Sequence, residues 1–137
     1  YIFIDCPPSL GLLTVNAMCA ADREIVPLQC EFYALEGLSQ LMHTIEMVQQ
    51  GLNRHLVVQG IVLTMYDSRN KLSEMVANDV RAHFGNLVYH TVIPRNVRIS
   101  EAPSFGQPVL IYDLKCAGAQ AYVALAAELL SQEKEAA

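Results

Sequence analysis

The feature that most constrains the fold is the run from Leu56 to Met65, which is almost continuously apolar and rich in Val and Ile. A strand of this composition has no polar face, so it has to be covered on both sides. Helices cover both faces of a sheet when they connect parallel strands, because such connections cross over the sheet. The run therefore predicts an α/β fold with a buried, mostly parallel sheet.

Strand and helix patterns alternate along the rest of the chain. Short apolar runs predict strands at 1–4, 24–28, 56–65 and 88–93, and apolar residues at helical spacing predict helices at 10–18, 35–51, 72–84 and 122–130. Ser9 is expected to cap the first helix and Gly85 to stop the third, whereas residues 94–108 are expected to form an irregular loop. The apolar face from Leu35 to Val48 is expected to be core rather than a groove for a partner. Ligands of such sheets bind at the carboxyl ends of the strands.

Composition excludes several classes of protein. The 137 residues are 53% apolar and 17% charged, which fits one packed domain and not a disordered tail. A net charge of −5 excludes a globally basic nucleic-acid binder, although it leaves room for a local basic patch. The four cysteines, at positions 6, 19, 30 and 116, form no C-x-x-C pair. We therefore expect small core residues rather than a disulfide or zinc framework.

The segment from Ile2 to Pro8 brings one carboxylate, that of Asp5, to the end of an apolar strand. In P-loop nucleotide hydrolases an acid in this position helps to hold Mg²⁺. Pro7 and Pro8 force an extended exit from the strand and stiffen the loop that follows. Taken alone the motif is weak, because many α/β strands end in an acid that only caps the next turn.

Four longer blocks of sequence resemble the ParA family, the chromosome- and plasmid-partitioning ATPases related to MinD. The blocks begin Asp-Cys-Pro-Pro-Ser-Leu-Gly at residue 5, Gln-Cys-Glu-Phe-Tyr at 29, Leu-Thr-Met-Tyr-Asp-Ser-Arg at 63 and Thr-Val-Ile-Pro-Arg-Asn-Val-Arg at 91. They stand in the family's order and cover essentially the whole chain. The resemblance implies that residues 1–137 are the C-terminal portion of a single P-loop ATPase domain and start at its Walker B strand.

The family also has a deviant Walker A loop, a glycine-rich turn with two lysines, which has no counterpart among these residues. We therefore expect a partial P-loop NTPase fold that lacks the N-terminal P-loop strand. The family places that strand beside the Walker B strand, so residues 1–5 are expected to be partly unpaired. The full-length protein would be an ATP hydrolase, and the chain alone is expected to be inactive.

The resemblance implies roles for individual residues. Asp5 would act on Mg²⁺ through water, and residues 7–16, with Pro7 and Pro8, would form the switch II segment that senses the γ-phosphate. The adenine side of the nucleotide site would be formed by Thr64, Met65, Asp67, Pro94 and Arg95. From the residues alone, Met65 could equally be core and Asp67 a turn former.

Two arginines, Arg69 and Arg98, match residues that the resemblance assigns to DNA binding by the ATP-bound dimer. Exposed loop arginines in general often do no more than solvate the surface, and it is the resemblance that favours DNA. Many relatives carry several basic residues just before the last helix. Here that stretch retains only Lys115, which weakens the expected DNA surface.

By resemblance, the complete protein would bind ATP and Mg²⁺, form a homodimer with ATP and coat nucleoid DNA non-specifically in the cytoplasm. A ParB-type centromere-binding partner would stimulate hydrolysis. One alternative is a MinD-like or cellulose-synthesis-associated positioning ATPase, and another is a non-catalytic interaction module if the protein is only 137 residues long. Residues 131–135 contain no large apolar side chain, so membrane anchoring is not expected.

Overall fold

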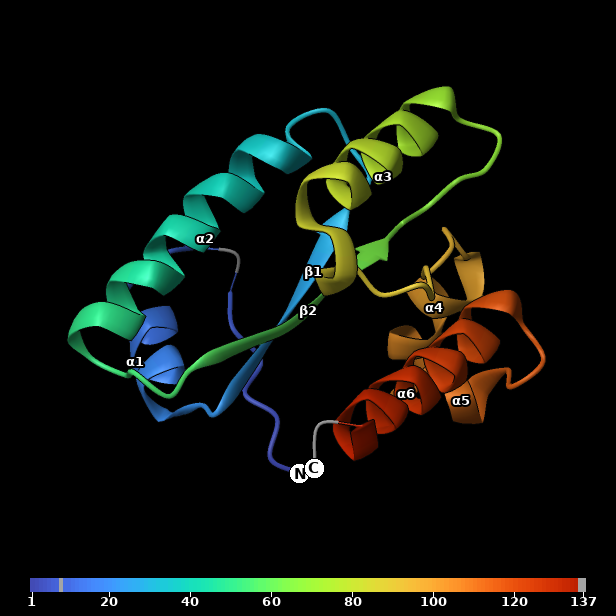
Figure 1. Cartoon of the computed structure of the whole chain (residues 1–137). Helices are drawn as coiled ribbons and strands as arrows, with labels where there is room; N and C mark the ends of the chain where they lie inside the picture. The colour runs from blue at the N-terminus through green and yellow to red at the C-terminus, as the bar shows by residue number, and fades with distance from the viewer. Residues whose placement is uncertain (8, 136–137) are drawn as a thin grey trace.

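The computed structural model describes residues 1–7 and 9–135, the last of these without its side chain. In chain order the elements are α1 (Leu12–Ala20), β1 (Arg23–Gln29), α2 (Ala34–Gly51), β2 (Val57–Thr64), α3 (Lys71–Phe84), the 3₁₀ turn η1 (Gly85–Leu87), α4 (Val97–Glu101), the 3₁₀ turn η2 (Ala102–Phe105), α5 (Val109–Tyr112) and α6 (Ala117–Glu135). Helices α2 and α3 lie on one side of the two strands and α6 on the other (Figure 1). Among the described residues, no helix combines the length and apolarity needed to cross a membrane.

Strands β1 and β2 form a parallel two-stranded sheet, as the alternating pattern predicts. Arg23 pairs with Val57 at one end, and Gln29 pairs with Thr64 at the other. The register shifts between Glu24 and Ile25, which leaves Gln59 as an extra residue on β2. Both carboxyl ends therefore reach the same edge of the sheet, where ligands of α/β proteins bind.

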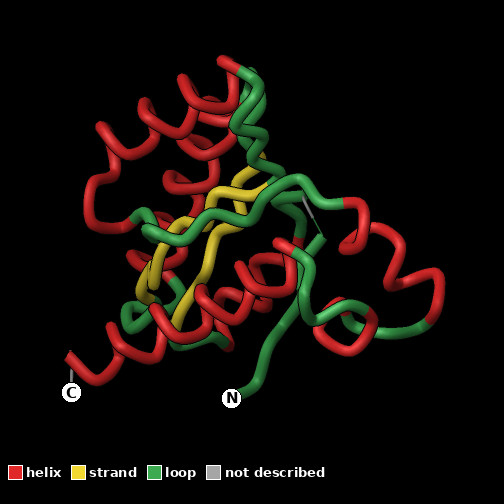
Figure 2. Tube along the Cα trace, turned by 90° about the vertical axis from the view of Figure 1, so that its right-hand side faces the viewer, coloured by secondary structure: helices red, strands yellow, loops and turns green. Residues whose placement is uncertain are grey.

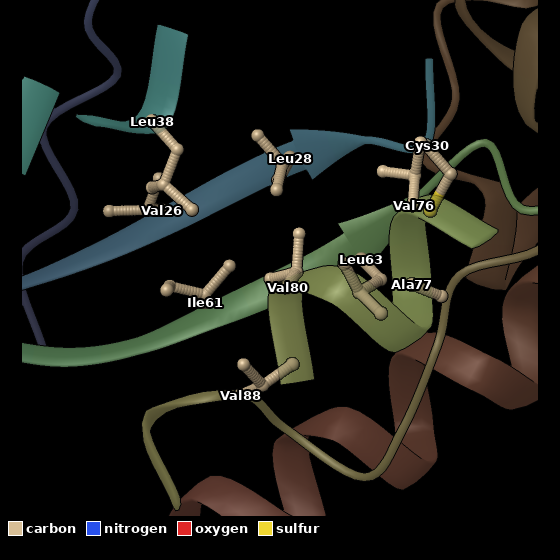
Figure 3. Close-up of a cluster of buried hydrophobic side chains, with 10 residues drawn as sticks. All are labelled: Val26, Leu28, Cys30, Leu38, Ile61, Leu63, Val76, Ala77, Val80 and Val88. Carbon is tan, nitrogen blue, oxygen red and sulfur yellow. The ribbon is translucent and has the colours of Figure 1, made fainter. Parts of the chain in front are cut away.

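The middle of β2 is buried on both faces, which confirms the prediction made from its composition. Ile61 and Leu63 are fully buried in a cluster with side chains of β1, α2 and α3 (Figure 3). Val62 points to the opposite face, where it packs with Tyr89, Ile93 and residues of α6. The alternation of side chains along a strand explains why one short segment contributes to two separate clusters.

Helix α2 turns its apolar face inward, with Leu38, Ile45 and Val48 buried. This confirms that the face belongs to the core. Helix α3 ends at Gly85, whose φ of +51° is left-handed, a conformation that glycine adopts at no steric cost. The prediction for Ser9 is wrong, because Gly11 is the N-cap of α1 and no side chain caps that helix. Instead, the Thr14 hydroxyl donates a 2.6 Å hydrogen bond to the Ser9 carbonyl.

The predicted strand at 88–93 does not form a continuous ladder beside β2. Tyr89 N–H donates to Ile61 O at 3.0 Å and Ile93 N–H donates to Leu63 O at 2.8 Å, so four steps of this segment face two steps of β2. The surplus residues turn out of the ladder, and distant side chains satisfy their backbone groups. Arg81 donates to the carbonyls of residues 89 and 90, and Glu128 accepts from the N–H groups of residues 90 and 91.

The predicted strand at 1–4 is not formed either. Residues 1–7 rise from the amino-end level of the strands to their carboxyl-end level, and no strand of the described part pairs with them (Figures 1 and 2). The side chains of Ile2 and Phe3 are 94% and 81% exposed. The expectation that this segment lacks pairing is therefore confirmed, and the lack is complete.

Two smaller expectations are wrong. Residues 94–108 are not an irregular loop throughout, because Asn96 caps α4 by accepting from Arg98 N–H at 2.9 Å and η2 follows at Ala102, with Pro103 near its start. Of the four cysteines only Cys30 is buried, while Cys6 and Cys19 are exposed and Cys116 is half-buried. The two exposed cysteines lie in the unpaired N-terminal segment and at the end of α1, neither of which is covered.

Candidate functional site

The carboxyl edge of the sheet carries an open groove of about 820 Å³. Its walls come from the end of β1, the residues that follow β1 and β2 and the first turns of α2 and α3, and Arg95 also lines it. Of the five residues expected on the adenine side, Met65, Asp67 and Arg95 line this groove. A smaller hollow of about 240 Å³ lies beside it and is lined by Thr64, Met65 and Pro94.

Met65 lines both hollows, so it joins the two halves of the expected adenine side. Its φ of 52° is the one positive value found for a non-glycine residue in the described part of the chain. Left-handed backbone is unfavourable for an unbranched side chain such as Met, and strain of this kind concentrates at functional sites. Met65 thus combines a left-handed backbone with a position in the lining of both hollows.

The side chains of Asp67 and Arg69 form a hydrogen-bonded ion pair. The Arg69 Nε and Nη2 atoms each lie 3.0 Å from a different oxygen of the Asp67 carboxylate, and Arg69 N–H donates to the same carboxylate at 3.0 Å. The hydrogen bonds from Arg69 lower the pKa of Asp67 and raise the pKa of Arg69. Asp67 thus shapes its own turn, and both of its oxygens are already engaged by the arginine expected to contact DNA.

Arg95 lines the groove together with a carboxylate, that of Glu31. Its Nη2 atom is 4.0 Å from Oε1 of Glu31, in the loop that follows β1. That loop also presents Phe32 and Tyr33, both 74% exposed, with ring centroids 5.1 Å apart in an edge-to-face arrangement. Sequence reasoning gave these three residues no role, although they lie in one of the four blocks that carry the resemblance.

Arg98 is held by two carboxylates. Its Nη1 atom is 2.9 Å from Glu101 Oε2, and its Nε atom is 3.5 Å from Asp113 Oδ2. The hydrogen bond to Glu101 and the charge of that carboxylate raise the pKa of Arg98. Lys115 lies next to this group, because its N–H donates to the other oxygen of Asp113 at 3.2 Å.

Asp5 stands apart from these residues. Its side chain is exposed, and within residues 1–7 and 9–135 it makes no hydrogen bond or ion pair. Pro7 is also exposed, and Pro8 lies outside the described residues. The described part contains no group of three or more potential metal ligands, so a protein cage for a metal is not found there. A single exposed carboxylate instead fits Mg²⁺ that takes its other ligands from water and phosphate.

Comparison with known proteins gives close relatives along the whole chain. A family profile described as an AAA domain matches residues 1–58. The chromosome partitioning protein ParA of Caulobacter vibrioides is 70% identical over 135 residues, which cover 98% of this chain and 51% of that protein. The sporulation initiation inhibitor protein Soj of Bacillus subtilis is 55% identical over 129 residues, which cover 94% of this chain and 51% of that protein. The chain thus spans about half the length of these relatives.

Solved structures agree on the fold. A cobyrinic acid a,c-diamide synthase from Mycobacterium smegmatis, solved with bound ADP and magnesium, is 40% identical and superposes with a TM-score of 0.74 over 97% of this chain and 47% of that one. The cell division ATPase MinD from Pyrococcus furiosus is 24% identical, with a TM-score of 0.71 over 97% of this chain and 51% of that one. These likenesses confirm the α/β P-loop NTPase fold.

Proposed function

We propose that this chain, which belongs to the ParA family of chromosome-partitioning proteins, is the Walker B half of a DNA-partitioning ATPase. The observation that carries the proposal is the 70% identity to the Caulobacter ParA protein across 98% of the chain. Because the chain spans about half of that relative, the activity is proposed for the complete protein. Residues 1–137 would form the C-terminal portion of its single ATPase domain, and the chain alone would not hydrolyse ATP.

The proposed chemistry is phosphoryl transfer from ATP to water. Catalysis in this class is mostly positioning plus charge stabilisation, and bound Mg²⁺ would supply part of the charge stabilisation at the phosphates. Asp5 would orient the water shell of the ion, and residues 7–16 would follow the presence of the γ-phosphate. Thr64, Met65 and Pro94 would contact the base in the smaller hollow. Asp67 and Arg95 would line the larger groove, which lies beside that hollow.

The proposed cargo is DNA held without sequence preference. An ATP-bound homodimer would place Arg69 and Arg98 from each protomer against phosphates, with Lys115 beside them. A ParB-type partner would stimulate hydrolysis and release the dimer from the nucleoid, in the cytoplasm. The likeness to MinD is one of fold, whereas relatives at 70%, 56% and 52% identity are named for chromosome partitioning, which favours DNA over another cargo.

The test of this proposal replaces both arginines, Arg69→Ala and Arg98→Ala, in the complete protein. A dimer would lose up to four phosphate contacts, so the slope of log K against log salt should become shallower by up to about 3.6. The loss should be alike on unrelated DNA sequences, because phosphate contacts carry no base information. ATP-dependent dimerisation should persist. Unchanged affinity and slope would remove DNA binding from these arginines, and failure to dimerise would assign them to the nucleotide site.

A further inference from the structure

The ion pairs around Arg98 differ from an ordinary surface salt bridge in their charge. One guanidinium lies between Glu101, on its own helix α4, and Asp113, which follows α5. Two carboxylates against one guanidinium make a group with a net charge of −1. At the Asp67–Arg69 pair, by contrast, one carboxylate meets one guanidinium and the charges cancel.

Both carboxylates accept hydrogen bonds from groups other than Arg98. Glu101 accepts from the Tyr112 hydroxyl at 3.3 Å, and the ring of Tyr112 stacks on Phe105 with centroids 5.1 Å apart. Asp113 accepts from Lys115 N–H at 3.2 Å. These contacts place the two acids in position independently of the arginine, so the guanidinium is bound by a preformed acceptor pair.

The arginine is nevertheless within reach of a large ligand. Its side chain is 53% exposed, whereas those of Glu101 and Asp113 are 40% and 33% exposed. A phosphate that approaches the exposed side of Arg98 meets two acids in the same place. It can bond to guanidinium N–H groups that the acids leave free, but both carboxylates repel it, and relief of that repulsion requires Arg98 to move away from them.

We propose that Glu101 and Asp113 form a latch that holds Arg98 away from DNA, so that DNA binding at this position exchanges carboxylate for phosphate. The inference rests on the proposed DNA-binding function and adds its regulation. The latch lowers the affinity of the dimer for DNA and keeps Arg98 ordered between binding events.

The experiment uses the complete protein with ATP and a DNA duplex of random sequence, at one fixed salt concentration. The variants are Glu101→Gln and Asp113→Asn, separately and together, each also made with Arg98→Ala. The amides keep the shape of the acids and can still accept from Tyr112 and Lys115 N–H. Asp79→Asn is the matched control, because Asp79 is an exposed acid on α3 whose carboxylate has no hydrogen bond or ion pair with the described residues.

Each amide variant should bind DNA about two- to fivefold more tightly, since an exposed ion pair of this kind is weak. The gain should disappear when Arg98 is alanine, and Asp79→Asn should give no comparable gain. Unchanged or weaker binding in the amide variants would overturn the latch, and weaker binding would make the acids positioning residues for Arg98. A gain that survives Arg98→Ala would overturn it too, as a general effect of charge.

The same data separate this inference from the proposed function. If Arg98→Ala weakens binding of the parent and the amides do not tighten it, only the latch is wrong. If Arg98→Ala changes nothing in the parent or in the amide variants, the latch and the DNA role of Arg98 are both wrong. If Arg98→Ala has an effect only in the amide variants, the latch is supported in its strongest form.

Discussion

Residues 1–4 and strand β2 have similar apolar compositions, but only β2 forms a strand. Both are apolar and β-prone, yet Ile61 and Leu63 in β2 are fully buried, whereas Ile2 and Phe3 are 94% and 81% exposed. The difference lies in their neighbours. An apolar segment becomes a strand only where another backbone offers a ladder and other elements cover its faces.

Strand β2 has partners on every side. β1 pairs with one edge, residues 88–93 contact the other through the Ile61–Val88 bridge and two backbone hydrogen bonds, and helices cover both faces. Within the described part of the chain, residues 1–4 take part in a hydrogen bond from the Tyr1 hydroxyl to Glu133, one from the Cys6 thiol to the Ile4 carbonyl, and a stack of Tyr1 on Phe3. β2 therefore belongs to the core of this chain. Residues 1–4 lack the neighbouring P-loop strand that the proposed complete domain would supply.

The largest expected effect is in β2, the buried one of the two segments. Leu63→Ala should lower the free energy of unfolding by about 4 kcal/mol, because it removes a fully buried side chain and leaves a cavity. Urea denaturation followed by circular dichroism measures this. Leu12→Ala, at an exposed apolar residue on α1, is the control and should have little effect. Equal losses in the two variants would contradict the view that β2 holds the core.

The next effect falls on the exposed segment and on activity. In the complete protein, Asp5→Ala should lower Mg²⁺-dependent ATP hydrolysis at least a hundredfold, equivalent to about 2.7 kcal/mol in the barrier. The melting temperature should stay close to that of the parent, because the Asp5 side chain has no bonded partner among the described residues. Steady-state phosphate release measures the first quantity. Parental hydrolysis in this variant would remove Asp5 from the site.

Gly60→Ala tests how closely β2 is covered on its outer side. A Cβ at Gly60 would lie 2.5 Å from Cε2 of the Tyr89 ring and 3.1 Å from the carbonyl oxygen of Leu87. The ring is buried and has little room to move, so the substitution should cost about 2 kcal/mol. Gly37→Ala on α2 is the control, because nothing lies within 4 Å of its Cβ and alanine favours helix. A neutral Gly60→Ala would mean that residues 87–89 are loosely held.

Glu128→Gln probes the backbone that leaves the ladder beside β2. Burial opposes ionisation of Glu128, but hydrogen bonds from residues 90 and 91 outweigh it and lower its pKa. A lowered pKa means that the charged form stabilises the fold above the ordinary value near 4.5, and that this stability is lost as the pH falls through the lowered value. The variant should therefore lose about 1 kcal/mol at neutral pH, since the group is partly exposed.

The pH dependence distinguishes this effect from a packing defect. The difference in unfolding free energy between parent and Glu128→Gln should begin to shrink below about pH 4.5, where the carboxylate of the unfolded chain becomes protonated, and should be lost as the pH falls through the lowered pKa of the folded protein. Denaturation curves at pH 7 and at pH 3 measure it. A difference that is the same at both pH values would assign the loss to side-chain shape and not to the charge.

The smallest expected effect is again in the exposed segment. Phe3→Ser in the chain of 137 residues should change the free energy of unfolding by less than about 0.5 kcal/mol, because the side chain is 81% exposed. In the complete protein, where this segment is proposed to pair as the Walker B strand, the same substitution should cost about 3 kcal/mol. Equal effects in the two contexts would show that the segment does not become a buried strand.

Sequence alone was enough for the elements whose signal is local. The sequence predicts four elements within one or two residues of their observed bounds: the strands at 24–28 and 56–65 and the helices at 35–51 and 72–84. Apolar periodicity and a helix-ending glycine such as Gly85 are local signals, since they depend only on residues close together in the chain. The resemblance of the four blocks led to the family. It also named the residues that gather around Met65 at the carboxyl edge.

Tertiary structure decided what depends on groups far apart in the chain. Residues 88–93 leave the ladder because Arg81 and Glu128, on two different helices, satisfy the backbone there. Arg98 has a second carboxylate partner because the fold brings Asp113 to it. The segment at 1–4 has the composition of a strand, but a strand needs hydrogen-bond partners, and the composition of a segment does not say whether those partners are present.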